Sequence, residues 1–379
     1  MTLVHVVVPE GIDNPERPSG GNVYDRWVCR GLAALGWTVH ERSIPGRWPR
    51  ADGAELAGLA EALDAVPNGG LVLLDGLIAS AAPEAMSASA DRLRLVVLVH
   101  MPLGAAAVME RASEARDRER HALSCAEAVI ATSSWTRDWL LENYALPDDS
   151  VGVVEPGVDS ARIAPGTATG GQLVCVAAVT PAKGHDILLS ALAMVRDLAW
   201  ECVCVGSLDL DPEFVAYLEG QARRTGIADR IRFTGPLTGV QLDGAYSSAD
   251  ALVLPSRAET YGMVITEALA RGLPVIATSV GGVGEAVGAT SDGVRPGLLV
   301  PPGQPAAYGA ALRCWLVDED RRRRLREAAR QRRRTLISWD QTAKRLSRRL
   351  ADVTRSDDPA ARRIASPRRY RPADRGASR

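Results

Sequence analysis

Residues 251–277 read ALVLPSRAETYGMVITEALARGLPVIA and contain two glutamates, Glu259 and Glu267, which are separated by seven residues. The apolar run before the first glutamate is typical of a buried strand, and the second glutamate lies in a run whose apolar positions recur at helical spacing. We therefore expect Glu259 on the loop that leaves the strand and Glu267 about two turns into the next helix. At about 1.5 Å of rise per residue, the helix would carry Glu267 roughly 10 Å further along.

Two carboxylates at that separation suit one elongated ligand better than one reacting atom. One carboxylate can bind a sugar hydroxyl, the other can bind a ribose diol, and a diphosphate can lie near the N-terminus of the helix between them. The alternative interpretation is an ordinary strand–helix–strand unit that carries two surface glutamates.

The rest of the chain alternates short apolar runs with helical segments, which is typical of parallel α/β sheets. In the first half, strands are expected at 3–8, 37–42, 71–74, 95–99, 128–131 and 152–154. Residues 155–172 are rich in Pro and Gly and poor in apolar residues, so we expect an interdomain linker there. The pattern then repeats, with strands expected at 173–179, 200–205, 231–233, 251–254, 274–277 and 298–300. The sequence therefore predicts two similar doubly wound α/β domains.

The order of elements in residues 251–277 resembles the E-x7-E segment of the retaining GT4-like glycosyltransferases, also called glycosyl transferases group 1. The shared pattern is strand, Pro-Ser, glutamate, small loop, glycine, helix, glutamate, Ala-rich helix, Gly-x-Pro and a second strand. Two later landmarks of the family follow in the same order, at 281–285 and 297–303, and Glu285 is a further candidate for nucleotide contact. The resemblance covers nearly the whole chain.

This resemblance implies the GT-B fold, with two doubly wound parallel-sheet (Rossmann-like) domains that face a central cleft. Residues 1–160 would form the N-terminal acceptor-side domain, completed by a C-terminal helix at 339–353. Residues 170–337 would form the C-terminal domain that binds the nucleotide sugar.

Two further motifs carry groups that can bind phosphate, and each follows a predicted strand. Gly20 and Gly21 open the first helix, where glycine lets backbone N–H groups approach an anion at the positive helix end. No G-x-G-x-x-G fingerprint of a dinucleotide site follows the first strand directly. Lys183 stands just past the first strand of the second half, at the sheet edge where ligands collect. An ordinary tight turn and a solvated lysine are the alternatives.

The resemblance also assigns roles to single residues. It implies that Lys183 neutralises the diphosphate, that Glu259 and His100 position the sugar, and that Glu267 binds the ribose. Without it, a lone histidine at the end of a strand, such as His100, is more often structural than catalytic. The expected catalytic residues are His100, Lys183 and Glu259, and the expected donor-binding residues are Gly20, Gly21, Lys183, Arg257, Tyr261, Gly262, Met263 and Glu267.

The chain departs from the family at one position in this set. GT4-like proteins usually carry an arginine five residues before the phosphate lysine, and here that position is Ala178. Arg257, two residues before Glu259, is the nearest candidate in the sequence to replace that cation.

Composition excludes several other classes of protein. The chain has 379 residues, with room for two domains, and its net charge of −1 argues against nucleic-acid binding. Its longest nearly apolar stretch, 95–109, is shorter than the ~18 to 20 residues that span a bilayer, and no signal peptide is visible. We expect a cytoplasmic protein with at most peripheral contact at the inner face of the membrane.

The sequence predicts no metal site. The six cysteines are scattered without paired C-x2-C spacing, so core thiols are expected rather than structural zinc. The pair Asp209 and Asp211 lies in a connector with Pro212 and is interpreted as a helix cap rather than a metal ligand.

The end of the chain divides into a helical part and a tail. Residues 321–334 are densely basic with an apolar stripe at helical spacing, so we expect a surface helix with a solvated arginine face. Residues 354–379 contain almost no bulky apolar side chains and are expected to be disordered.

The resemblance implies a retaining glycosyltransferase of the hexosyltransferase type, and the lack of a metal motif in the sequence predicts that it is metal-independent. A nucleotide-diphosphate sugar would be its co-substrate, with no other cofactor, and its acceptor would be a glycan, a lipid or a small molecule. The alternatives are another GT-B enzyme, such as a sugar-nucleotide 2-epimerase or a phosphorylase, or a catalytically weak partner subunit of an active transferase. The sequence leaves the sugar, the base, the acceptor and the oligomeric state open.

Overall fold

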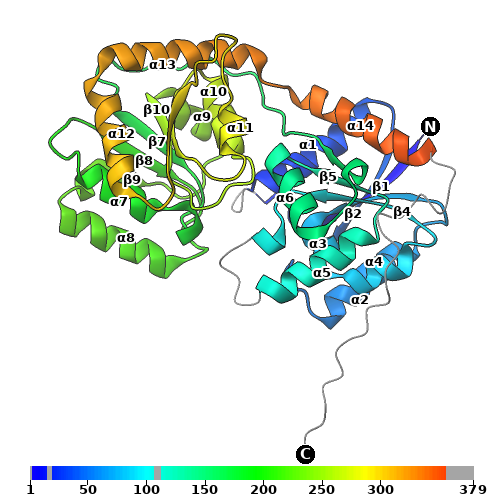
Figure 1. Cartoon of the computed structure of the whole chain (residues 1–379). Coiled ribbons are helices and arrows are strands. Elements are labelled where there is room, and N and C mark those ends of the chain that lie inside the picture. Colours follow the sequence, from blue (N-terminus) through cyan, green and yellow to red (C-terminus); the bar gives the residue numbers. More distant parts are fainter. Residues whose placement is uncertain (1, 15–18, 106–111, 356–379) are drawn as a thin grey trace, which may run out of the picture.

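The computed structural model describes residues 2–14, 19–105 and 112–355, which form two six-stranded parallel sheets (Figure 1). The first sheet has the order β2-β1-β3-β4-β5-β6 and the second has the order β12-β11-β10-β7-β8-β9. The strands of the first sheet are β1 (Leu3–Pro9), β2 (Thr38–Ile44), β3 (Leu71–Asp75), β4 (Arg94–Val99), β5 (Ala128–Ala131) and β6 (Val151–Val153). Those of the second are β7 (Gln172–Val176), β8 (Glu201–Val205), β9 (Ile231–Phe233), β10 (Ala251–Leu254), β11 (Val275–Thr278) and β12 (Gly297–Val300).

All the expected strands are present, and the expected fold class is confirmed. The largest difference is in the run 173–179, where β7 ends at Val176. A Cβ built on Gly206 would lie 2.0 Å from the carbonyl oxygen of Ala177, so the backbone after β7 packs closely against the turn after β8. At the end of the apolar run, Val179 is fully buried, and its amide donates to the Ser207 carbonyl of that turn at 2.9 Å.

Helices cover both faces of each sheet, and this burial explains the continuous apolar strands. Around the first sheet lie α1 (Gly20–Ala34), α2 (Gly53–Asp64), α3 (Gly76–Ala81), α4 (Pro83–Ser89), α5 (Ala112–Ser124) and α6 (Ser134–Tyr144). Around the second lie α7 (His185–Ala193), α8 (Pro212–Thr225), α9 (Gly239–Ser247), α10 (Met263–Ala270), α11 (Val283–Val287), α12 (Pro305–Val317) and α13 (Glu319–Arg332). The Asp211 side chain accepts a hydrogen bond from the Phe214 amide, so its predicted role as the N-cap of a helix, α8, is confirmed.

The last helix, α14 (Trp339–Arg355), returns to the first sheet and lies against α1 (Figure 1). Trp27 stacks on Trp339 with ring centroids 5.6 Å apart, and a Cβ on Gly31 would lie 2.5 Å from that of Ala343. The chain therefore passes between the two sheets twice, after β6 and again after α13. The domain limits 1–160 and 170–337 stay predictions.

The expected solvated arginine face of α13 is wrong for several of its arginines. Arg322 is only 7% exposed and donates to the carbonyl oxygens of Trp315 and Leu316. Arg326 pairs with the fully buried Asp250 at 2.6 Å. These side chains bind α13 to the end of α12 and to the second sheet, because guanidinium groups can satisfy several buried acceptors at once.

All six cysteines are free thiols, and five of them are buried, as expected for core thiols. Of the predicted tail, residues 356–379 lie outside the described part of the chain. Among the described residues, no helix has both the length and the apolar content needed to cross a bilayer.

Candidate active site

The candidate residues meet where the carboxyl ends of the two sheets face each other. A Cβ built on Gly20 would lie 3.2 Å from Sδ of Met263, the first residue of α10. A Cβ on Gly21 would lie 3.2 Å from Cδ2 of His100, just past β4. The N-termini of α1 and α10 therefore lie close together, and two positive helix ends face the same region.

Lys183 and Glu259 come together although 76 residues separate them in the sequence. The Lys183 Nζ atom donates to Glu259 Oε1 at 2.6 Å, and the Ser256 hydroxyl donates to the same oxygen at 2.9 Å. Gly184, at φ +70°, makes this approach possible, because a Cβ there would lie 2.2 Å from the Pro255 carbonyl oxygen. The lysine and the first glutamate of the sequence motif thus form an ion pair.

The landmark Gly281-Gly282 supports the loop that carries Glu259. A Cβ on Gly281 would lie 1.7 Å from the Glu259 carbonyl oxygen, and one on Gly282 would lie 2.2 Å from that of Thr260. The Gly282 amide also donates to the Glu259 carbonyl at 3.1 Å. Any side chain at these two positions would displace the loop, so both glycines serve the site through packing.

Glu267 lies one turn into its helix, so the expected two turns are wrong. The helix α10 begins only at Met263, because Gly262 takes a left-handed φ of +87° and ends the loop there. Along the axis, Glu267 is therefore only about 6 Å beyond the helix start. Its Oε2 accepts from the Tyr246 hydroxyl at 2.8 Å, and burial raises its pKa above the ordinary range. Its Oε1 has no hydrogen-bond partner among the described residues.

Arg257 already has a carboxylate partner. Its guanidinium donates to both oxygens of Asp186, at 2.8 and 2.6 Å, and to the Pro181 carbonyl at 2.6 Å. Burial acts to raise the pKa of Asp186, but the hydrogen bonds and charge of Arg257 hold it below the ordinary value. Arg257 thus ties the Glu259 loop to the turn that carries Lys183.

The Tyr261 side chain lies away from the other candidates. It is 7% exposed and packs in the core of the second sheet. It also lines a cavity of about 220 Å³ together with Glu155, Arg332 and other residues of the two interdomain connections. Only the backbone of Tyr261 remains a candidate for contact with a ligand.

His100 belongs to a buried cluster that the sequence did not indicate. Its Nε2 lies 2.8 Å from Asp25 Oδ1 and 3.6 Å from Asp75 Oδ2. Burial acts to lower the pKa of His100, but the two carboxylates outweigh it and the pKa is raised. Burial and the neighbouring Asp25 raise the pKa of Asp75 to about 7, with His100 opposing.

These three side chains are the one group in the described ranges whose His and Asp donor atoms all lie within 4.8 Å of one another. The direct contact of His100 with Asp25 uses the atoms that would bind an ion, and we interpret the cluster as hydrogen-bonded. Asp75 ends β3 at the carboxyl edge of the sheet, a signal that sequence reasoning could have used. Asp25 lies one turn after Gly21 within a helix and carries no such signal.

Two contacts join α11 and the loop between β10 and α10 to the first half of the chain. The Ser133 hydroxyl, at the N-cap of α6, donates to the Thr260 carbonyl at 2.7 Å. Glu285 accepts from the backbone amides of Ser134 and Trp135 at 2.8 and 3.4 Å. Glu285 therefore caps a helix of the opposite half, a role that its position in the sequence did not indicate.

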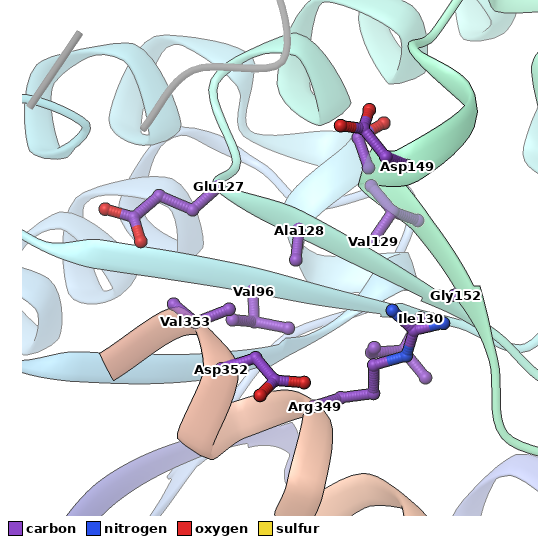
Figure 2. Close-up of a pocket in the computed structure, with 11 residues that line it drawn as sticks. Val96, Glu127, Ala128, Val129, Ile130, Asp149, Gly152, Arg349, Asp352 and Val353 are labelled. Carbon is purple, nitrogen blue, oxygen red and sulfur yellow. The ribbon is translucent and has the colours of Figure 1, made fainter. Parts of the chain in front are cut away.

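Another cavity lies elsewhere and is not part of this site. Its volume is about 350 Å³, and it lies between α14 and the amino ends of β5 and β6 (Figure 2). Arg349 extends over Gly152 there, and a Cβ on that glycine would lie 2.8 Å from its Nε atom (Figure 2). The candidate residues occupy the opposite ends of the strands.

Comparison with known proteins gives matches to both halves of the chain. Residues 4–162 match the family described as Glycosyltransferase Family 4, and residues 165–332 match the Glycosyl transferases group 1 family. The D-inositol 3-phosphate glycosyltransferase of Salinispora tropica is 33% identical over 252 residues, or 60% of this chain and 51% of the relative. The protein of that name from Streptomyces avermitilis is 35% identical over 247 residues, or 59% and 52%. The aligned part spans about half the length of these curated relatives.

Solved structures match over nearly the whole chain. A sucrose-phosphate synthase from Thermosynechococcus elongatus has a TM-score of 0.78 and 22% identity, over 93% of this chain and 99% of that one. HepE from Anabaena, solved with UDP-glucose, has a TM-score of 0.74 and 16% identity, over 93% and 100%. Because both halves match in chain order and both sheets are arranged as in these structures, the chain belongs to the GT4 family of glycosyltransferases, with the GT-B fold.

Proposed function

We propose that the chain transfers a hexose from a nucleotide-diphosphate sugar to a hydroxyl acceptor with retention of configuration. The observation that carries this proposal is that two positive helix ends lie side by side, one of them four residues after Glu259, which pairs with Lys183. The N-termini of α1 and α10 lie together, and Lys183 lies 2.6 Å from Glu259. A diphosphate at the two helix ends would compete with Glu259 for Lys183, which would free the carboxylate for a sugar hydroxyl.

In this proposal, the donor lies mainly on the second sheet. Glu267 binds the ribose hydroxyls through its unpaired Oε1, and the backbone at Gly20, Gly21, Gly262 and Met263 supports the phosphates. Charge developing on the leaving diphosphate is stabilised by groups that are already in place, which lowers the barrier to cleavage of the glycosidic bond. Acceptor attack on the same face as the departing diphosphate would retain the configuration.

The relatives suggest which substrates to test first. The HepE structures contain UDP and UDP-glucose, and the curated relatives are called D-inositol 3-phosphate glycosyltransferases. We propose UDP-glucose and other UDP-hexoses as first donors and inositol phosphates as first acceptors. The match covers only 51% of the Salinispora tropica relative and 52% of the Streptomyces avermitilis one, so a wider panel of glycans, lipids and small molecules belongs in the same screen.

The test measures release of nucleoside diphosphate with and without acceptor, and the anomeric configuration of the product by NMR. A transferase releases the diphosphate in proportion to acceptor. Release without acceptor, together with a changed sugar, would indicate a 2-epimerase, and dependence on inorganic phosphate would indicate a phosphorylase. Turnover only after addition of another chain would indicate a partner subunit. We also propose that turnover survives EDTA; complete loss that is restored by magnesium or manganese would contradict metal independence.

A further inference from the structure

The imidazole of His100 is held on three sides by α1. Its Nε2 lies 2.8 Å from Asp25 Oδ1, and the Gly21 backbone lies against its Cδ2 edge. The Tyr24 ring meets it edge to face with centroids 5.2 Å apart. Tyr24 is itself fixed, since its hydroxyl donates to the Val154 carbonyl at 2.9 Å and its side chain is fully buried. The orientation of the ring is therefore set by Asp25, Tyr24 and the backbone of Gly21.

The two nitrogens of this imidazole differ in what they meet. Nε2 faces Asp25, with Asp75 at 3.6 Å, whereas Nδ1 has no hydrogen-bond partner among the described residues. The His100 side chain is 17% exposed. With Nε2–H donated to Asp25, Nδ1 is the atom left for a ligand, and it can donate a hydrogen bond only when the ring is protonated.

Buried carboxylates explain why the ring would be protonated. Asp25 from α1 is 3% exposed and Asp75 from the end of β3 is 5% exposed, so neither is well solvated. A buried carboxylate next to an imidazole is stabilised when the imidazole carries a positive charge. Burial of His100 opposes this effect, but the two carboxylates outweigh it and raise its pKa. Tyr24, the remaining titratable neighbour of the ring, stays neutral because burial raises its pKa well above the ordinary value.

The other two cations of the candidate site already have partners. Lys183 pairs with Glu259 at 2.6 Å, and Arg257 pairs with Asp186 at 2.6 Å. We propose that Asp25 is a positioning residue of the donor site, which holds His100 so that Nδ1–H donates to the bound sugar diphosphate. This inference rests on the proposed function for the nature of the ligand. The role is electrostatic: the His100 proton stays on the ring while the glycosidic bond breaks.

The first experiment needs no turnover. The chain contains five histidines, so imidazole ¹⁵N resonances can be followed by NMR and His100 assigned with His100→Gln. In the wild type, His100 should titrate above the ordinary value of about 6.5. In Asp25→Asn the midpoint should fall, and in Asp25→Glu it should recover in part. Asp64→Asn is the matched control, because the Asp64 side chain is 79% exposed and Arg92, its partner, keeps its bonds to the Val66 and Leu63 carbonyls.

The second experiment tests the ligand. Nucleoside diphosphate should shift the Nδ1 resonance of the wild type, and Asp25→Asn should lower kcat/KM roughly tenfold or more, the scale of one charge-assisted hydrogen bond. In the pH profile of kcat/KM, the alkaline limb of Asp25→Asn should begin at a lower pH than that of the wild type, because the pKa of His100 is lower in this variant. A merely structural defect would not shift that limb. Asp25→Glu should restore part of kcat/KM.

Three results would overturn the inference. One is a titration midpoint of His100 in the wild type that lies below the ordinary histidine pKa. This measurement does not depend on the folding of any variant. Another is an unchanged midpoint in a folded Asp25→Asn. A third is a His100 resonance that moves on treatment with EDTA and returns with zinc or manganese, since the cluster would then bind a metal. Failure of the proposed function is distinct: every donor would be inert while the His100 titration still depended on Asp25.

Discussion

Replacement of Glu267 by Gln tests the ribose end of the proposed donor site. The Tyr246 hydroxyl donates to Glu267 Oε2 at 2.8 Å, and a glutamine oxygen can accept the same bond. The substitution therefore keeps the shape of the side chain and its internal partner and removes only the charge. A hydrogen bond to a charged group contributes about 1.5 to 3 kcal/mol, so Kd for nucleoside diphosphate should rise roughly 10- to 150-fold.

The pH dependence gives a second measure of the same group. Burial raises the pKa of Glu267, so its carboxylate is lost on acidification earlier than that of an ordinary glutamate. Because the ionised form is the better acceptor for the ribose hydroxyls, wild-type affinity should fall as the pH drops through that raised pKa. Glu267→Gln should lack this step.

The assay is isothermal titration calorimetry with UDP and other nucleoside diphosphates at several pH values. Glu213→Gln serves as the control, because Glu213 is exposed in the first turn of α8 and has no part in the proposed site. Equal affinity of Glu267→Gln and wild type, with the same pH profile, would refute the placement of the ribose at Glu267.

Three further outcomes are expected. Lys183→Ala should nearly abolish turnover and Arg257→Ala should lower it at least about tenfold, the scale of one charged contact; wild-type rates in Arg257→Ala would remove that residue from the site. Glu285→Gln should weaken the cap on α6 and make the chain larger by small-angle X-ray scattering, and an unchanged radius of gyration would show that the cap does not hold the halves together. Truncation after Arg355 should leave turnover and Tm unchanged, and a lowered Tm would show that the tail packs on the fold.

The positions of the strands were predictable from the sequence, and so were the strand ends at which binding residues lie, because both follow from local sequence patterns. Strands buried on both faces read as continuous apolar runs, and ligands collect at the carboxyl edge of a parallel sheet. Lys183 and Glu259 each follow a strand of the second sheet, β7 and β10, which are neighbours in it. Their contact could therefore be expected from the sequence, although its distance of 2.6 Å could not.

Residues whose roles depend on packing between distant elements were not predictable. Asp25 lies within α1 and meets His100 only because α1 packs across the end of β4, 75 residues away in the sequence. Arg322 is indistinguishable by pattern from its exposed neighbours in α13, yet it is the one that binds the carbonyls at the end of α12. In both cases the partner is fixed by tertiary structure and leaves no local signal in the sequence.

The contacts between the two halves involve the same loop that carries Glu259. Thr260, which accepts from Ser133 of the first half, directly follows Glu259, whose backbone rests on Gly281 and Gly282. A diphosphate that draws Lys183 away from Glu259 would therefore act on a loop that is also bonded to α6. Donor binding and the relative position of the halves are then linked through one short segment. If the halves can take two relative positions, the donor shifts the equilibrium between them only by its difference in affinity for the two. Position 178 is alanine, where GT4-like proteins usually carry an arginine five residues before the phosphate lysine. In the proposed function, that differential affinity must therefore come mainly from Lys183, the two helix ends and the charge of His100.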